Sequence, residues 1–202
     1  MLMFIFGLTG PSGAGKGTIA ELFAKYKVYS VDTDAVYHEL LENDRELNLE
    51  LAAAFGAGIL GEGGKVNRKL LAATVFGKEN TPALLHTLNQ ITHKYVMSET
   101  KKRLAEYANT APAALIDAPL LFEAGLDSWC EAVIGVLADR ETRIQRVMKR
   151  DGIDRAAAIR RIDAQPDDNF FRARCSIVLE NNGDLANLQK KVRKILAAWK
   201  MV

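Results

Sequence analysis

A glycine-rich stretch near the amino terminus, Gly10-Pro-Ser-Gly-Ala-Gly-Lys-Gly-Thr18, has the residue types that bind phosphate groups. Its glycines allow backbone conformations that are closed to residues with a Cβ, so main-chain N–H groups can surround an anion. Lys16 adds a positive charge. The alternative, a turn that only joins two elements, does not explain Lys16 and both flanking elements. The stretch therefore predicts a polyphosphate-binding loop, here called the phosphate loop, formed by Gly10, Pro11, Ser12, Gly13, Ala14, Gly15, Lys16, Gly17 and Thr18.

Gly17 departs from the common pattern Gly-x-x-x-x-Gly-Lys-Ser/Thr, in which a hydroxyl at this position meets Mg²⁺. Consecutive helical residues point about 100° apart, so Thr18 cannot simply take over that contact. We expect phosphate oxygens and water molecules to hold Mg²⁺, without a direct side-chain ligand. Asp117, which follows a hydrophobic run, is the candidate for a contact through water.

The elements that must position the loop alternate between strands and helices. The apolar run from Leu2 to Phe6 predicts a strand before the loop, and the segment from Ile19 predicts a helix after it. A second strand, residues 28–31, ends at Asp32-Thr-Asp34. Ligands bind at the carboxyl ends of parallel strands, which places Asp34 near the phosphate loop. Asp34 is equally suited to cap the helix that follows, and local sequence alone favours neither role.

Residues 112–116, 132–137 and 176–179 read as three more strands, so we predict an α/β fold with a five-stranded parallel sheet. Residues 42–108 are mostly helical and too long for a simple crossover. They predict an inserted helical subdomain, with helices at 69–76 and 82–108 and a possible hairpin at 61–64. His93 lies in the long helix, where a lone histidine is more often structural than catalytic.

Arginines recur at positions 143, 146 and 150, a spacing that places them on one face of a predicted helix at 141–150. A second helix, 155–164, follows after Asp151-Gly152. Fixed cations suit the charge of a phosphoryl group in transfer, and the Asp-Gly break suits a movable lid. The alternative is a solvated face that pairs with Asp139 and Glu141. An amphipathic helix at 184–199 ends the chain.

The 202 residues favour one domain, and 49% hydrophobic with 26% charged residues is ordinary for a globular protein. A net charge of +2 and the lack of an aromatic-rich platform argue against nucleic-acid binding. No apolar run approaches the roughly 20 residues of a membrane span. Cys130 and Cys175 suggest neither a zinc site nor a disulfide, so we expect a cytoplasmic protein. The oligomeric state stays open.

Taken together, the motifs resemble the dephospho-coenzyme A kinase family. The matching residues run in family order along almost the whole chain: Gly7-Leu-Thr-Gly10, the phosphate loop, Asp32-Thr-Asp34, Arg68 with Val75-Phe76, Ile91-Thr-His93, Asp117-Ala-Pro-Leu-Leu-Phe-Glu123, Arg146 with Arg150, Arg161-Ile162 with Gln165, and Asn181-Asn-Gly183. Departures from the family pattern are Gly17 for serine, Thr33 for alanine, Lys94 for proline, and Cys175-Ser176 for Ala-Asp.

The resemblance implies transfer of the γ-phosphoryl group of ATP to the ribose 3′-hydroxyl of dephospho-coenzyme A, with Mg²⁺. It implies that Asp34 is the catalytic base, assisted by Lys16 and Arg146. By the same resemblance, residues 11–18, Arg146 and Asn181 bind ATP, whereas the acceptor is bound by Thr9, Asp34, Arg68, His93 and Leu121. It also implies one P-loop kinase domain with a core (1–34, 109–140, 174–202), an acceptor-binding insertion (35–108) and a lid (141–173).

Two other functions compete with this one. A nucleoside monophosphate kinase is favoured slightly by the Gly-Lys-Gly-Thr sequence around Gly17, which looks like the loop of adenylate kinases. The residues from His93 to Glu123 argue against a nucleoside monophosphate kinase. A non-catalytic nucleotide-binding switch would not need Asp34 or an arginine-rich lid.

Overall fold

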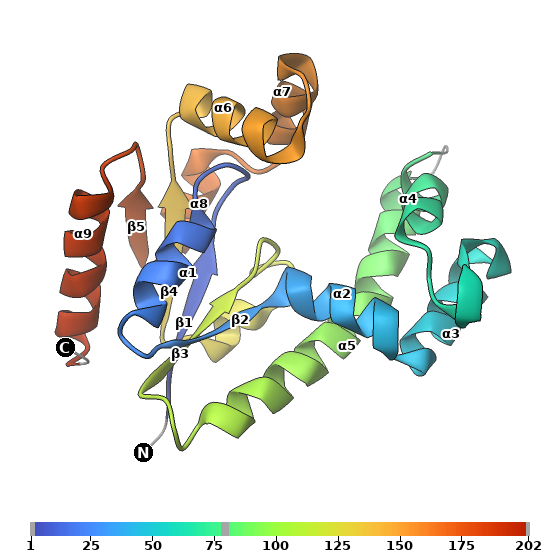
Figure 1. Ribbon diagram of the computed structural model, residues 1–202, viewed down its shortest axis with the longest axis horizontal. Helices are drawn as coiled ribbons and strands as arrows, with labels where there is room; N and C mark the ends of the chain where they lie inside the picture. The colour runs from blue at the N-terminus through green and yellow to red at the C-terminus, as the bar shows by residue number, and fades with distance from the viewer. Residues whose placement is uncertain (1–2, 78–80, 201–202) are drawn as a thin grey trace. The chain divides into compact units, whose positions relative to one another are not determined.

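A five-stranded parallel sheet forms the centre of the fold. The computed structural model describes residues 3–77 and 81–200, and its strand order is β2, β3, β1, β4, β5 (Figure 1). This confirms the predicted α/β class. The strands are β1 (Phe4–Thr9), β2 (Tyr29–Asp32), β3 (Ala113–Asp117), β4 (Ala132–Leu137) and β5 (Ile177–Glu180).

The first strand extends beyond its predicted end. The apolar run predicts a strand over 2–6, of which Leu2 lies outside the described residues, whereas β1 continues to Thr9. The extra residues stay in the sheet because both neighbouring strands pair with them: Leu8 is in register with Asp117 of β3, and Thr9 with Gly135 of β4. The strand therefore leads directly into the phosphate loop.

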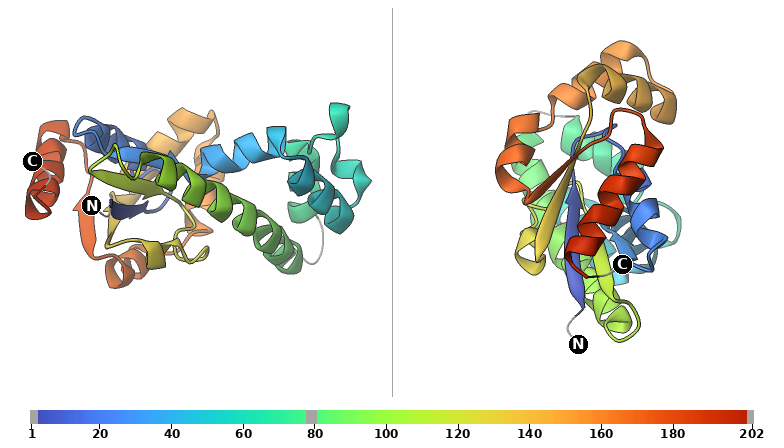
Figure 2. Two further views of the ribbon diagram at one scale, coloured as in Figure 1. Left: turned by 90° about the horizontal axis from the view of Figure 1, so that it is seen from below. Right: turned by 90° about the vertical axis from the view of Figure 1, so that its left-hand side faces the viewer.

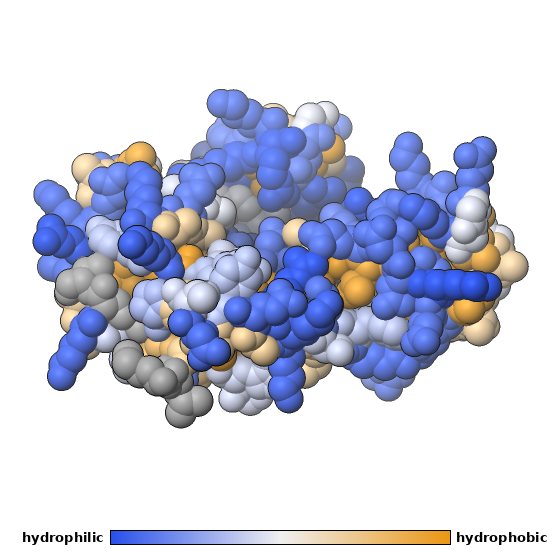
Figure 3. Space-filling view, turned by 60° about the horizontal axis from the view of Figure 1, so that its bottom comes forward, coloured by the Kyte–Doolittle hydropathy of each residue, from blue (hydrophilic) through white to orange (hydrophobic). Residues whose placement is uncertain are grey.

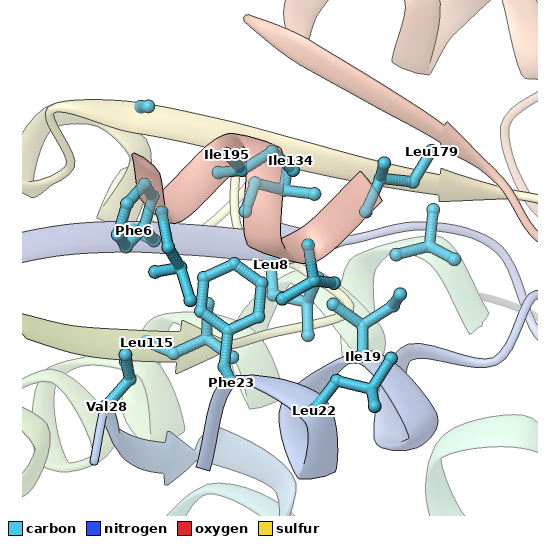
Figure 4. Close-up of a cluster of buried hydrophobic side chains, with 14 of the residues drawn as sticks. Phe6, Leu8, Ile19, Leu22, Phe23, Val28, Leu115, Ile134, Leu179 and Ile195 are labelled. Carbon is cyan, nitrogen blue, oxygen red and sulfur yellow. The ribbon is translucent and has the colours of Figure 1, made fainter. Parts of the chain in front are cut away.

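One face of the sheet packs against α1 (Lys16–Ala24) and α9 (Leu185–Ala198). Strand residues alternate between faces, so Phe6 and Leu8 point to the same side, and both are fully buried. Figure 4 shows them among side chains from both helices, including Phe23 and Ile195. Burying each such side chain contributes about 1.5–3 kcal/mol. This core fixes α1, and with it the end of the phosphate loop.

The opposite face of the sheet is covered by α8 (Asp168–Arg174) and the short 3-10 helix η3 (Leu126–Trp129), as the right-hand view of Figure 2 shows for α8. Glycines let this layer approach closely. A Cβ on Gly7 would lie 2.8 Å from Leu121 Cδ2, and one on Gly135 would lie 2.7 Å from the Sγ of Cys175. With both faces covered, β4 is buried at every residue, as expected of a central parallel strand.

Two helices, α6 (Arg140–Asp151) and α7 (Arg155–Asp163), form a hairpin above the carboxyl ends of the strands (Figure 1). They match the predicted helices 141–150 and 155–164 within two residues. Gly152 ends α6 with a φ of 64°, a left-handed conformation that glycine adopts without steric cost. The hairpin has its own apolar core of Ile144, Val147, Ala158 and Ile162.

The described residues divide into two compact units. The first, here called the sheet unit, holds the residues up to Val31 and from Glu106 onward, and the second, the helical unit, spans Asp32–Ala105. The helical unit contains the elements α2 (Thr33–Asn43), α3 (Arg45–Phe55), η1 (Ala57–Ile59), η2 (Glu62–Gly64), α4 (Arg68–Phe76) and most of α5 (Thr81–Tyr107). The predicted hairpin at 61–64 is the 3-10 turn η2, closed by a single antiparallel bridge between Leu60 and Val66.

A buried asparagine ties the helical unit together. The Nδ2 of Asn48 donates to the carbonyl oxygens of Leu41 at 3.0 Å and Asp44 at 2.8 Å, and its Oδ1 accepts from the N–H of Val66 at 3.0 Å. A buried amide that satisfies its hydrogen bonds in this way specifies one arrangement of its neighbours. Asn48 therefore fixes the segment that leads into α4.

The molecular surface is largely hydrophilic on the face that Figure 3 shows, with apolar side chains in small groups. The most exposed large apolar residues include Leu49, Phe76 and Leu185. Among the described residues, no helix combines the length and apolar character required to cross a membrane.

Candidate functional site

The phosphate loop joins the carboxyl end of β1 to the first turn of α1. Three of its four glycines have positive φ angles, 143° at Gly10, 79° at Gly13 and 97° at Gly15. Gly15 is the N-cap residue of α1, and no side chain caps this end of the helix. The N-terminal N–H groups of α1 and the positive end of its dipole therefore face the space enclosed by the loop, an arrangement that suits an anion.

Close contacts with three other segments explain why these positions must be glycine. A Cβ on Gly10 would lie 2.2 Å from the carbonyl oxygen of Val136, and one on Gly13 would lie 2.6 Å from that of Arg143. A Cβ on Gly15 would lie 2.2 Å from Asn181 Nδ2. The end of β4, α6 and the turn after β5 thus hold the loop from three sides.

Asn181 and Arg146 make direct hydrogen bonds to the loop backbone. Asn181 Nδ2 donates to the Ala14 carbonyl at 2.8 Å. The Nη1 of Arg146 donates to the carbonyls of Gly13 at 3.2 Å and Ala14 at 3.3 Å, and its Nη2 donates to that of Asn181 at 3.1 Å. The structure therefore brings these two sequence-predicted residues together at the loop, 35 positions apart in the chain.

A cavity of about 230 Å³ opens beside this contact. It is lined by Gly15, Thr18, Arg146, Asn181, Gly183, Leu185 and Leu188. The two leucines, from the start of α9, supply an apolar wall, while Arg146 and Asn181 supply polar groups. Sequence reasoning identified the polar pair but missed Leu185 and Leu188, which lie within the amphipathic helix predicted at 184–199.

The lysine and the residues after it occupy the first turn of α1. Lys16 Nζ lies 3.4 Å from the carbonyl oxygen of Gly10, so the side chain folds back along the loop. Gly17 is exposed, and a Cβ there would meet no atom within 4 Å. The site therefore has room for a side chain at position 17, although this chain has none.

The arginine row of α6 faces the phosphate loop and α8 rather than Asp139 and Glu141. Arg143, with 9% of its side chain exposed, pairs with Asp168 at 3.4 Å. Arg150 donates to both carboxylate oxygens of Asp151, at 2.7 and 2.9 Å, and to Ser12 Oγ at 3.3 Å. Hydrogen bonding by Arg150, together with the nearby charge of Arg161, lowers the pKa of Asp151. Glu141 pairs instead with Arg155 of α7.

Three predicted residues lie at the ends of β1 and β3 or just beyond. Thr9 is fully buried, and its hydroxyl donates to the carbonyl oxygen of Pro119 at 3.3 Å. Leu121 is also fully buried and lies against Gly7. Asp117 is half-buried at the carboxyl end of β3, next to β1. Their contacts with an acceptor or a metal stay predictions.

Asp34, Arg68 and His93 belong to the helical unit. Asp34 is an exposed residue in the first turn of α2, and it is not the helix cap: Asp32 is the N-cap, and its carboxylate accepts from the N–H groups of Asp34 at 2.9 Å and Ala35 at 3.0 Å. Of the two roles left open for Asp34, the structure excludes that of helix cap, because α2 begins at Thr33 and Asp32 precedes it. His93 is half-buried in α5.

Arg68 lines an open cavity of about 950 Å³ within the helical unit. Val66, Leu71, Phe76 and Leu88 supply apolar wall, and the ion pair of Lys65 with Glu42, 3.3 Å apart, adds charge. Burial raises the pKa of Tyr37, which also lines the cavity, and the charge of Arg68 opposes that shift. Sequence reasoning found only Arg68 and Phe76 here, because the other residues carry no motif.

The described residues contain no group of three histidine, cysteine, aspartate or glutamate side chains that could hold a metal ion. Cys130 and Cys175 are both free thiols.

A glycine-rich loop that follows the central strand of a five-stranded parallel sheet and enters a helix defines the class of P-loop nucleotide-binding proteins. Comparison with known proteins narrows this class. The family model described as dephospho-CoA kinase matches residues 4–187. The dephospho-CoA kinase of Lactobacillus johnsonii is 34% identical over 196 residues, covering 96% of this chain and 98% of that protein. One from Corynebacterium glutamicum is 38% identical over 197 residues, with 96% of each chain covered.

Solved structures agree with the sequence comparison. A crystal structure from Thermus thermophilus superposes with a TM-score of 0.82 at 32% identity and covers 98% of both chains. The dephospho-CoA kinase from Campylobacter jejuni has the same fold, with a TM-score of 0.68 at 24% identity, covering 96% of this chain and 95% of that one. The chain belongs to the dephospho-CoA kinase family, whose activity is an ATP-dependent phosphotransfer.

Proposed function

We propose that the protein transfers the γ-phosphoryl group of ATP to the ribose 3′-hydroxyl of dephospho-coenzyme A and releases ADP and coenzyme A. The observation that carries the proposal is the family match over residues 4–187, which includes a phosphate loop held by Arg146 and Asn181. Phosphoryl transfer requires in-line positioning and stabilisation of charge more than covalent chemistry by the protein. Main-chain N–H groups, a lysine, arginines and a carboxylate meet that requirement.

At the donor end, residues 11–18 would bind the phosphates of ATP. Lys16 would be the cation that stays close to the phosphoryl group during its transfer. The adenine would occupy the cavity beside Asn181, where Leu185 and Leu188 offer an apolar surface to its ring. Arg146 lies on both the cavity and the loop, so one guanidinium could stabilise the charge that develops on the phosphates.

At the acceptor end, Asp34 would accept the proton of the attacking hydroxyl. The capping of α2 by Asp32 is compatible with this role, because it does not require the carboxylate of Asp34 as the helix cap. The cavity lined by Arg68 would bind part of the acceptor. The guanidinium of Arg68 would lie near the phosphate groups of the acceptor, and the apolar wall would lie along the less polar part of the acceptor. Thr9, His93 and Leu121 complete the proposed acceptor set.

Mg²⁺ would be held mainly by phosphate oxygens and water, with Asp117 acting through a water molecule. Gly17 supports this proposal, because a residue without a side chain cannot supply the hydroxyl ligand of the common loop pattern. When bound, the ion offsets the negative charge of the phosphates.

We also propose that the chain is divided into a core (1–34, 109–140, 174–202), an acceptor-binding insertion (35–108) and a lid (141–173). A cytoplasmic location is supported by the two free cysteines, which suit a reducing compartment. The partners are the small molecules ATP and dephospho-coenzyme A, without nucleic acid or membrane.

A coupled assay of ADP release tests the acceptor. The purified enzyme is incubated with ATP, Mg²⁺ and one acceptor at a time: dephospho-coenzyme A, AMP, CMP or shikimate. We expect turnover that depends on dephospho-coenzyme A. Turnover with AMP alone would instead identify a nucleoside monophosphate kinase, and nucleotide binding without any acceptor-dependent turnover would identify a non-catalytic switch.

A further inference from the structure

Gln165, in the connection between α7 and α8, contacts the phosphate loop although it lies 153 positions away in the sequence. Its Oε1 accepts a hydrogen bond from the main-chain N–H of Ser12 at 2.8 Å. Its own N–H donates to the carbonyl oxygen of Ile162 at 3.1 Å, which anchors the residue to the end of α7. The first contact is to Ser12, one of the residues assigned above to ATP, but the proposed function gives Gln165 itself no role.

The peptide group between Pro11 and Ser12 is held at both ends. Its carbonyl oxygen, that of Pro11, accepts from the N–H of Ala14 at 3.2 Å, and its N–H donates to Gln165. This peptide lies between Gly10 and Gly13, whose positive φ angles mark the two bends of the loop. Glycine places few limits on rotation, so the sequence of the loop alone does not fix the plane of this peptide.

The α6–α7 hairpin is a firm support for this contact. Besides its apolar core, it contains the ion pairs Arg155–Glu141 at 2.7 Å and Arg140–Asp163 at 2.7 Å, which join the two helices. Exposed ion pairs of this kind add little stability one by one, but they fix the register of two helices that already pack together. The same hairpin reaches Ser12 a second time, because Arg150 donates to its hydroxyl oxygen. Ser12 is thus held by α6 and by the connection that follows α7.

We propose that Gln165 is a positioning residue for the donor nucleotide. By fixing the Pro11–Ser12 peptide, it keeps the following N–H groups of the loop oriented toward the triphosphate before ATP binds, and it couples the α6–α7 hairpin to the loop. The effect on phosphate binding rests on the proposed function, whereas the hydrogen bond itself does not. Preorganised donors bind an anion more tightly because less of the binding free energy is used to order them.

The test compares three variants. Gln165→Leu removes the acceptor oxygen, and Gln165→Glu keeps an acceptor oxygen at the same reach. Gln145→Leu is the matched control, because Gln145 is an exposed residue of α6 whose Nε2 donates to Glu141 of the same helix. Hydrogen exchange of the Ser12 amide is measured in the enzyme without nucleotide, together with the dissociation constant of ATP and the KM of dephospho-coenzyme A.

For Gln165→Leu we expect faster exchange of the Ser12 amide and ATP binding that is about three- to ten-fold weaker, the effect of losing one hydrogen bond. The KM of dephospho-coenzyme A should stay within two-fold of the wild-type value. General loosening of the structure would instead weaken the binding of both substrates. Gln165→Glu should restore the protection of the Ser12 amide. Gln145→Leu should match the wild type in every measurement.

The inference is overturned if Gln165→Leu leaves the Ser12 amide protected, or if it binds ATP as tightly as the wild type. Equal losses for ATP and dephospho-coenzyme A would also overturn it, because they would indicate a general structural role. Failure of the proposed function is a separate outcome: the wild-type enzyme would then show no turnover with dephospho-coenzyme A, while the exchange measurement, which needs no substrate, would still report on the hydrogen bond.

Discussion

The side chain of Asn181 donates a hydrogen bond to the main-chain carbonyl of Ala14 at 2.8 Å, so the turn after β5 supports the phosphate loop directly. Asn181 is 7% exposed, and its main-chain N–H donates to the carbonyl oxygen of Leu137 at 2.8 Å. A residue at the far end of the chain is thereby fixed by the sheet and in turn fixes the loop. The shape of the loop is therefore a property of the whole sheet unit.

We expect Asn181→Asp to weaken both folding and ATP binding. The substitution replaces the donating amide by a carboxylate oxygen that faces the Ala14 carbonyl, which should lower the free energy of unfolding by about 1–3 kcal/mol. Because the loop loses a support, the dissociation constant of ATP should rise by about ten-fold or more. Urea unfolding and calorimetric titration with ATP measure the two effects.

The matched control for that change is Asn109→Asp. Asn109 is an exposed residue of the turn that follows α5, where the same substitution should leave both quantities unchanged. If Asn181→Asp behaved like this control, the contact with Ala14 would have no part in supporting the loop.

We expect Gly15→Ala to abolish tight ATP binding, whereas Gly17→Ala should preserve it. An alanine at position 15 would need a φ near 97° and would clash with Asn181, a strain of about 1–3 kcal/mol before any displacement of the loop. Position 17 is an exposed helical site with free space, so alanine there should stabilise the protein by about 0.5–1 kcal/mol. Nucleotide titrations and thermal unfolding of the two variants would show the contrast, and equal ATP affinities would contradict it.

Sequence reasoning predicted the fold well because the informative signals are local. The apolar runs of β3 and β4 and the glycine pattern of the loop depend on neighbouring residues, and the structure places those strands within one residue of prediction. Local signals also gave the two arginine-rich helices. The misplaced end of β1 has a non-local cause, since Gly7–Thr9 remain in the sheet only because β3 and β4 pair with them.

The candidate site was harder to predict where it depends on contacts between distant segments. Asn181 and Arg146 were found through family motifs, but nothing in the sequence indicates that both contact the carbonyl of Ala14. Leu185 and Leu188 look like ordinary residues of an amphipathic helix. Local sequence left the role of Asp34 open between helix cap and catalytic base, and it did not identify Asp32 as the residue that caps α2.

We expect Asp34→Asn to lower kcat by about 10²- to 10⁴-fold, the usual contribution of a general base, with little change in ATP affinity. Steady-state kinetics with dephospho-coenzyme A and direct ATP titration measure these effects. Asp32→Asn is the matched control, because asparagine also caps helices well and should retain most of the activity. A near-normal kcat for Asp34→Asn would rule out the proposed base.

We expect both cysteines to resist thiol reagents in the folded protein. Burial raises the pKa of the Cys130 thiol to about 12, with a smaller effect from Glu131 and Asp127, and burial raises that of Cys175 to about 11. Both thiols stay protonated near pH 8, and only the thiolate reacts. Titration with a chromogenic disulfide should therefore detect the two thiols only after denaturant is added. Rapid reaction of the native protein would contradict the prediction.

The same shifts predict how stability depends on pH. The folded state holds the thiol protons more tightly than the unfolded state, whose thiol pKa is about 8.5. The contribution to stability is therefore complete below that pH and is lost progressively as the pH rises toward 11 and 12. Denaturant unfolding of the double variant Cys130→Ala with Cys175→Ala should show a weaker decline in this range than the wild type does.

We expect Gly17→Ser to change the response to Mg²⁺. The space around position 17 accommodates a side chain, and a serine there would restore the hydroxyl that the common loop pattern offers to the metal. The Mg²⁺ concentration for half-maximal activity should therefore fall by about three-fold or more, the effect of one added ligand of modest strength. Activity measured against free Mg²⁺ at fixed ATP tests this, with Gly17→Ala as the control that adds a Cβ without a hydroxyl. An equal Mg²⁺ response of the two variants would mean that position 17 does not reach the metal, and that the ion in this protein is placed without regard to the residue there.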